Sequence, residues 1–168
     1  MAHDRSRIAK LAISHDAGQF DCGHAELNSF IRLHALQGQR AHISRTYVAV
    51  TGELIVGYHT LVVGSVAYED APERLAKGIP RYDIPVLLLA RLAVDQNWQA
   101  KGLGAALVAD AMRRTLQVAE IAGVRAMLVH AKGENVRAFY SYLGFEPFPG
   151  EPLILYRLVK DMRAMCKE

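Results

Sequence analysis

The sequence has few of the features that mark a special class of protein. Its two cysteines, Cys22 and Cys166, show neither metal-motif spacing nor a partner histidine cluster, so we expect no bound metal. Thiols this sparse are typical of a reducing cytosol. The longest apolar run, IPVLLLA at 84–90, is too short to cross a bilayer, and the N-terminus lacks the apolar core of a signal peptide. We therefore expect a cytoplasmic protein that does not bind membranes.

Charge of one sign is also scarce. The formal net charge of +3 falls well short of a DNA-binding tail, so we expect no direct DNA binding by this chain alone. Hydrophobic residues make up 51% of the sequence and charged residues 22%, which is ordinary for a globular protein. Because no repeat or linker divides the chain, we expect a single domain over residues 1–168.

Hydrophobic periodicity predicts alternating strands and helices. The predicted strands are 8–13, 45–50, 54–68, 85–94, 125–131 and 153–159, and the predicted helices are 24–37, 104–122 and 134–143. Gly57 and Gly64 should mark bends or bulges in the long strand, and Gly123 should cap the second helix. This order of elements is typical of an α/β (α+β) fold with a mixed central sheet flanked by helices.

A glycine-containing loop, QAKGLGA at 99–105, joins the predicted strand 85–94 to the helix that follows. Bare backbone N–H groups at a helix N-terminus suit a pyrophosphate, and Gly102 and Gly104 would let it approach closely. The spacing matches neither a Walker loop nor a dinucleotide-binding fingerprint. Taken alone, the pattern is also typical of a tight turn.

Its neighbours make the loop more specific. ARLAVDQNWQAKGLGAAL, followed by a helix, a strand and AFYSYLGFEP, resembles the GNAT-fold N-acetyltransferases. The resemblance implies a GNAT fold, acetyl-CoA as cofactor, and Tyr140 as the general acid beside the thioester sulfur. The implied cofactor-binding residues are Leu92, Ala93, Val94, Gln99, Ala100, Lys101, Gly102, Leu103, Gly104, Ala105 and Phe139. Many members carry an Asn seven residues before that tyrosine, where this sequence has Gly133.

A second resemblance covers nearly the whole chain. FDCGHAELNSFIRLHALQGQ, SRTYVAV, GYHTLVVGSVAYEDAP and LQVAEIAGVRAMLVHA look like the GNAT toxins of bacterial toxin–antitoxin modules. The resemblance implies acetylation of the α-amine of an aminoacyl-tRNA, which blocks translation. It also implies a ribbon-helix-helix antitoxin as partner and leaves a homodimer open.

The chemistry needs a proton for the departing thiolate, but the sequence offers no strong general base. Asp95 belongs to the loop, Glu134 opens a short helix, and His130 ends a buried strand. An α-amine titrates near 8, whereas a lysine amine, with a pKa of about 10.4, would need a base. The missing base favours an aminoacyl substrate.

Four basic residues are candidate tRNA contacts. Arg91 lies in an apolar strand, where a buried arginine needs a partner. A structural ion pair and a contact with substrate phosphate explain it about equally well. Arg74, Lys77 and Arg81 cluster at 69–83, which we expect to be a polar loop or a short helix, and should contact tRNA phosphates. The alternatives are a GNAT enzyme for a small amine or a peptide N-terminus, and a binding module without catalysis.

Overall fold

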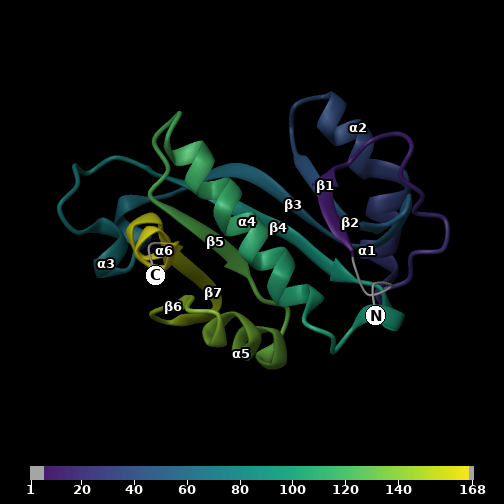
Figure 1. Cartoon of the computed structure of the whole chain (residues 1–168). Helices are drawn as coiled ribbons and strands as arrows, with labels where there is room; N and C mark the ends of the chain where they lie inside the picture. The colour runs from purple at the N-terminus through teal and green to yellow at the C-terminus, as the bar shows by residue number, and fades with distance from the viewer. Residues whose placement is uncertain (1–5, 167–168) are drawn as a thin grey trace. The chain divides into compact units, whose positions relative to one another are not determined.

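The computed structural model describes residues 6–166. Its contacts divide these residues into two compact units. The first holds the described residues up to Val62 with Ala90–Ala111, and the second holds Val63–Leu89 with those from Met112 onward. Seven strands are hydrogen-bonded in the order β1-β2-β3-β4-β5-β7-β6, and β3 and β4 run through both units (Figure 1). The predicted mixed sheet with flanking helices is confirmed.

The first unit is built on antiparallel strands and a broken helix. Its strands are β1 (Arg7–Lys10), β2 (Arg45–Thr51) and most of β3 (Leu54–Val66). Between β1 and β2 the chain forms α1 (Ala25–Ser29), a π-helical turn η2 (Phe30–His34) and α2 (Ala35–Arg40), which lie beside β1 and β2 in Figure 1. The two-residue turn between β2 and β3 begins at Gly52, whose φ of +63° suits glycine.

Both faces of this sheet are covered. On one face, Val48, Val50 and Tyr58 pack with Phe20 and Ile31. On the other face, Ala49 and Val56 meet Leu103 and Leu107 of α4 (Leu103–Ala119), which starts in this unit. Alternation along β2 separates Ala49 from Val48 and Val50, and Val56 reaches the same face as Ala49 because it is the extra residue of a bulge. A register shift between Ala49 and Val50, opposite Gly57, confirms the predicted bulge.

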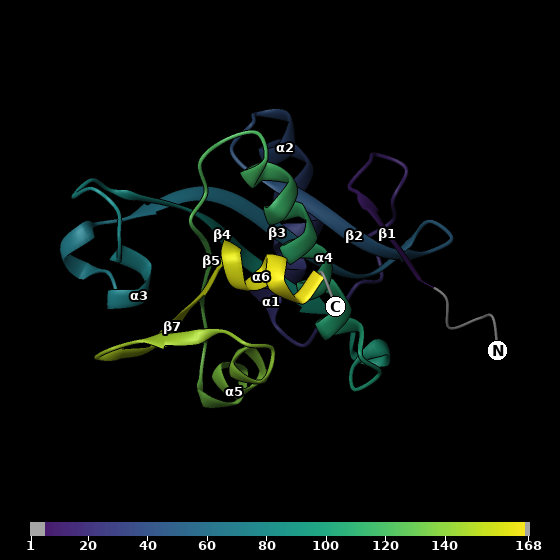
Figure 2. The same ribbon diagram turned by 60° about the vertical axis from the view of Figure 1, so that its left-hand side comes forward.

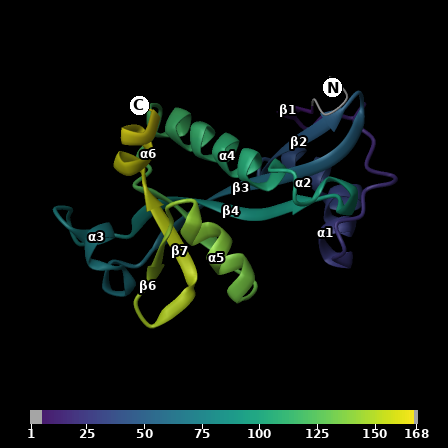
Figure 3. The same cartoon turned by 60° about the horizontal axis from the view of Figure 1, so that its bottom comes forward.

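The second unit combines parallel and antiparallel pairing. It holds η3 (Tyr68–Asp70), α3 (Glu73–Ala76), most of β4 (Ile84–Val94), the end of α4, β5 (Ala126–His130), α5 (Glu134–Tyr142), β6 (Glu146–Phe148), β7 (Glu151–Leu158) and α6 (Val159–Cys166). Figure 2 shows α3 in the connection between β3 and β4. β4 pairs with β5 in parallel, and β7 pairs antiparallel with β5 and β6. Figure 3 shows the β6–β7 hairpin beside α5.

The core of this unit lies on the strand faces and beneath α3. Leu75 of α3 is fully buried against Ile84, Val86 and Leu128. At the end of α5, Gly144 adopts a φ of +97°, and a Cβ there would coincide with the guanidinium of Arg157. Arg157 Nη1 in turn donates a 2.6 Å hydrogen bond to the Leu143 carbonyl. Glycine is therefore required where α5 stops.

Several predicted boundaries were wrong. The first strand ends at Lys10 rather than 13, because the chain turns over 12–15, where the His15 N–H bonds to the Ala12 carbonyl at 3.0 Å. α4 ends at Ala119, four residues before Gly123, and Gly123 lacks the positive φ of a left-handed cap. The sequence prediction missed β6 and α6, whose runs are too short to show a period, whereas α3 lies in the segment for which the sequence left a short helix open.

The described residues contain no helix that is long and apolar enough to cross a membrane. Between Ser6 and Cys166 we also find no group of three or more His, Cys, Asp or Glu residues placed to hold a metal ion. Cys22 is a free, buried thiol, and desolvation by burial raises its pKa.

Candidate functional site

The glycine loop starts from a strand end that Asp95 shapes. In the first unit, the Asp95 N–H bonds to the Val56 carbonyl at 2.9 Å, just after the last residue of β4. Its carboxylate accepts hydrogen bonds from the N–H groups of Asn97 at 2.9 Å and Asp21 at 3.1 Å. Asp95 thereby caps the 3-10 turn η4 (Gln96–Trp98). Its carboxylate supports the backbone and is not placed to act as a base.

Gln99 ties the loop to two other segments of the first unit. Its side-chain Nε2 donates to the Val94 carbonyl at 2.9 Å and to the Cys22 carbonyl at 3.2 Å. The amide therefore points into the protein backbone rather than away from it. This geometry gives the Gln99 side chain a role in positioning the loop, and the contact of Gln99 with the cofactor stays a prediction.

Two residues of the loop adopt left-handed backbone conformations. Ala100 has a φ of +62° and Gly102 a φ of +86°. No atom lies within 4 Å of where a Cβ on Gly102 would stand, so the space in front of this backbone is open. The first intrahelical bond of α4 runs from the Ala106 N–H to the Gly102 carbonyl at 3.1 Å, and the N–H groups before it lie at the helix end. The result is a cradle of backbone donors suited to an anion.

The start of α4 is seated closely on the sheet. A Cβ on Gly57 of β3 would lie 3.1 Å from Leu107, 3.2 Å from Leu103 and 3.3 Å from the Ala93 carbonyl oxygen. Trp98, just before the loop, packs against the same cluster. The ammonium of Lys101 lies 5.6 Å from the centre of the Trp98 ring. The rigid sheet therefore fixes where the cradle stands.

Arg91 of β4 has an aromatic partner that sequence reasoning missed. Its guanidinium carbon lies 3.8 Å from the centre of the Phe30 ring, in the π-helical turn of the same unit. Within residues 6–166 no carboxylate forms an ion pair with it, so the structural ion pair weighed from sequence is wrong. A cation stacked on a ring keeps its charge and its edge N–H donors. The predicted contact of Arg91 with substrate phosphate stays a prediction.

Tyr140 is buried in the second unit, on α5. It is 3% exposed, and its ring packs edge-on against Phe139 at 5.2 Å and Phe145 at 5.5 Å between ring centres. Burial raises the pKa of the Tyr140 phenol above its usual value, so the hydroxyl keeps its proton at neutral pH. Tyr142, two residues on, is 89% exposed, which shows that α5 buries the face carrying Tyr140. The arrangement suits a proton donor.

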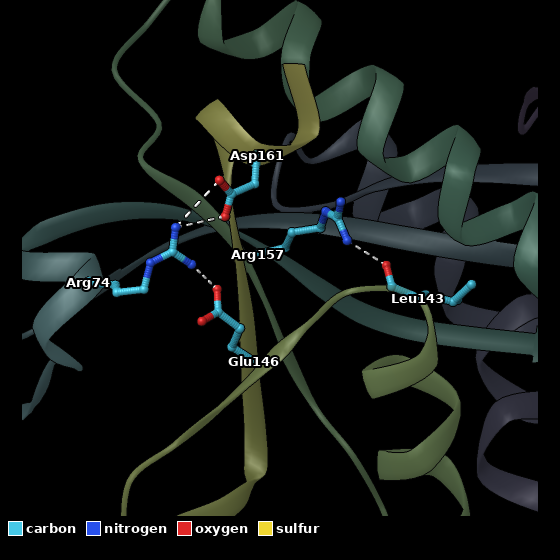
Figure 4. Close-up of polar contacts among 5 residues, drawn as sticks. All are labelled: Arg74, Leu143, Glu146, Arg157 and Asp161. Atoms are coloured by element: carbon cyan, nitrogen blue, oxygen red, sulfur yellow. Dashed lines mark hydrogen bonds and ion pairs between the residues drawn. The ribbon is translucent and has the colours of Figure 1, made fainter. Parts of the chain in front are cut away.

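The three cations of the basic loop at 69–83 differ in their interaction partners. The guanidinium of Arg74 forms ion pairs with Glu146 of β6 and Asp161 of α6, the latter at 3.1 Å (Figure 4). These carboxylates offset its charge, so Arg74 is the least suited of the three to a phosphate. Lys77 is exposed, and Arg81 lies 5.2 Å from the centre of the Tyr68 ring. Their contact with tRNA stays a prediction.

Comparison with known proteins gives the family. Residues 42–147 match the family model described as an acetyltransferase (GNAT) domain. The chain belongs to the GNAT acetyltransferase family. The matched segment includes the whole glycine loop and Tyr140, and the resemblance seen in the sequence is confirmed.

Similar proteins come from toxin–antitoxin systems. This GNAT chain is 40% identical over 156 residues to a tRNA-acetylating toxin of Mycobacterium tuberculosis, covering 93% of each chain. It superposes with a TM-score of 0.89 on AtaT complexed with acetyl-methionyl-tRNAfMet, at 30% identity, covering 96% of this chain and 99% of AtaT. A mutant AtaT bound to the C-terminus of the antitoxin AtaR and to acetyl-CoA gives a TM-score of 0.82 at 29% identity, covering 97% and 99%.

Proposed function

We propose that this protein transfers the acetyl group of acetyl-CoA to the free α-amino group of an amino acid charged onto tRNA, and so blocks translation. The observation that carries the proposal is the 40% identity, over 93% of both chains, with a tRNA-acetylating toxin. The similarity to AtaT, which was solved with an acetylated aminoacyl-tRNA, supports the same substrate class.

The loop of the first unit fits the pyrophosphate of coenzyme A. Backbone donors converge at the start of α4, the position of a Cβ on Gly102 is open, and Lys101 adds a positive charge. The backbone of Leu92, Ala93 and Val94, which ends β4 beside the loop, would hold the pantetheine arm. Bound acetyl-CoA supplies a thioester, an acetyl group activated for attack by an amine.

Tyr140 is the proposed proton donor. The neutral α-amine attacks the thioester carbonyl, the C–S bond breaks, and the sulfur takes the proton of the Tyr140 hydroxyl. The nitrogen releases a proton in turn, which restores the phenol, so the products are an amide and a thiol. A phenol is protonated at neutral pH even at its ordinary pKa of about 10, so the Tyr140 hydroxyl carries its proton before each turnover.

The state of two candidate bases supports an α-amine as acceptor. The carboxylate of Asp95 accepts two backbone hydrogen bonds, and that of Glu134 pairs with Arg137 at 2.7 Å. At pH 7.4 about one fifth of an amine with a pKa near 8 is neutral, against about one in a thousand for a lysine amine. An aminoacyl ester therefore needs no base, whereas a lysine substrate does.

The partners follow from the same proposal. Aminoacyl-tRNA and acetyl-CoA meet in the cytoplasm, which is where we place the protein. AtaT was solved with the C-terminus of its antitoxin, and we propose a ribbon-helix-helix antitoxin for this chain as well. A homodimer remains compatible with the proposal.

The decisive experiment offers the purified protein labelled acetyl-CoA with total charged tRNA, uncharged tRNA, polylysine and free amino acids. We expect label on charged tRNA alone, and we expect mild alkaline deacylation to remove it. Label on free amines or polylysine but not on tRNA would overturn the substrate and favour a small-amine or peptide acetyltransferase. Binding of acetyl-CoA without turnover on any amine would favour a binding module.

A further inference from the structure

A basic pocket of about 500 Å³ opens in the second unit, between the start of β5 and α6. Its described lining residues are Val124, Arg125, Leu158, Val159, Lys160, Arg163 and Ala164. Three of these side chains are cationic, four are aliphatic, and none of the described lining residues is acidic or aromatic. The Val159 N–H donates to the Arg125 carbonyl at 3.0 Å, which brings the two segments together.

The three cations keep most of their charge. Arg125 donates to the carbonyls of Leu75 at 3.0 Å and Lys77 at 2.8 Å, and these acceptors are neutral. Lys160 is exposed and forms no ion pair with any residue from 6 to 166. Arg163 pairs with Glu120 at 2.8 Å, but both side chains are exposed, and exposed pairs are weak. The pocket is therefore electropositive.

The hydrogen bonds of Arg125 also attach the basic loop to this pocket. They hold the backbone where α3 ends, at Lys77, whose side chain is exposed. Arg74, one turn earlier, is instead occupied by Glu146 and Asp161 (Figure 4). The exposed side chain of Lys77 therefore belongs to the same electropositive region as the pocket. Arg74 does not add to this region, because two carboxylates offset its charge.

We propose that this pocket binds a backbone phosphate of the tRNA substrate, a contact that rests on the proposed function. The described lining of the pocket has cationic side chains but no aromatic ring and no carboxylate. Such a lining is better suited to bind a phosphate than to bind the edge of a nucleotide base. Arg125 lies just before β5, and α5, the helix that carries Tyr140, follows β5. The five residues of β5 span about 13 Å, so the strand separates the pocket from the start of α5. The contact would therefore grip RNA away from the aminoacyl end and add affinity without sequence preference.

The test uses Lys160→Gln, Arg163→Gln and the double variant, with Lys10→Gln on β1 as a matched exposed control. Arg125 is left intact because its loss would free the loop. We expect each pocket variant to raise the KM for charged tRNA about tenfold. The double variant should also lower the slope of log affinity against log salt by about 0.7–0.9, the value for one lost phosphate contact. The kcat and the affinity for acetyl-CoA should stay unchanged.

The outcomes separate this proposal from the proposed function. Wild-type protein that acetylates charged tRNA, with pocket variants that match it in KM and salt slope, would overturn the pocket alone. Direct binding of uncharged tRNA tests the pocket even if no acetylation occurs. Polyglutamate serves as the probe for an acidic peptide. Variants that keep their affinity for tRNA but lose the binding of polyglutamate would show that the pocket binds a protein, which would also overturn the proposal.

Discussion

His59 of β3 and Asp110 of α4 form a buried pair in the first unit, with 2.8 Å between His59 Nε2 and Asp110 Oδ2. The His59 side chain is fully buried and that of Asp110 is 7% exposed. His59 also faces the ring of Tyr47, at 5.2 Å between ring centres. Asp110 lies two turns beyond the start of α4. The pair therefore joins the helix that carries the anion cradle to the middle of the sheet.

Breaking this pair should be costly. His59→Leu or Asp110→Leu leaves the other group buried without this partner, and we expect each to lower the free energy of unfolding by about 3 kcal/mol. The double variant should lose much less than the sum, because neither polar group of the pair remains. Urea titrations of the four proteins give the coupling energy.

The exposed pair Arg7–Glu53, at 3.9 Å, provides the control for this experiment. Glu53→Gln should change the free energy of unfolding by less than about 0.5 kcal/mol, because both partners are solvated. Strictly additive losses at His59 and Asp110 would contradict the coupling.

The sequence could reveal the glycine loop because its signal is local. A strand, two glycines one residue apart and a helix stand next to one another in the chain, and the motifs on either side make an anion cradle a more specific prediction than a tight turn. The orientation of Gln99 was not accessible in this way. Its amide bonds to the Cys22 carbonyl, 77 positions away, and no spacing rule predicts that partner.

The same limit applies to charged side chains. The cluster of Arg74, Lys77 and Arg81 was visible as composition, but the carboxylates that occupy Arg74 lie 72 and 87 positions further along. His59 and Asp110 are 51 positions apart, and each alone looked unremarkable in its strand or helix. Local patterns predicted the elements, whereas tertiary partners decide which polar groups remain available.

Gly102→Ala tests the anion cradle. A methyl group there meets no atom, so the expected cost comes from the backbone at a φ of +86°, about 1–2 kcal/mol. The loop should relax away from its conformation, and the dissociation constant of acetyl-CoA, measured by calorimetry, should rise about tenfold. Gly123→Ala has equally open space without a positive φ and should leave this constant unchanged. Equal effects of the two changes would argue against the cradle.

The buried phenols predict how stability depends on pH. Burial raises the pKa of both Tyr58 and Tyr140 in the folded protein, whereas unfolded tyrosine titrates near 10. Below about pH 10 both states keep the proton, and above it the unfolded state releases protons that the folded state retains. The free energy of unfolding should therefore fall as the pH rises above 10. Urea midpoints between pH 8 and 11 would show this, and Tyr140→Phe should flatten the fall.

Tyr140→Phe tests the proton donor directly. The change removes one hydroxyl and keeps the ring between Phe139 and Phe145, so the fold should persist. We expect kcat with charged tRNA to fall by about a hundredfold or more, while the KM for acetyl-CoA changes little. Tyr142→Phe, on the exposed face of the same helix, is the matched control and should keep full activity. A Tyr140→Phe enzyme with unchanged kcat would show that this phenol does not supply the proton to the leaving thiolate.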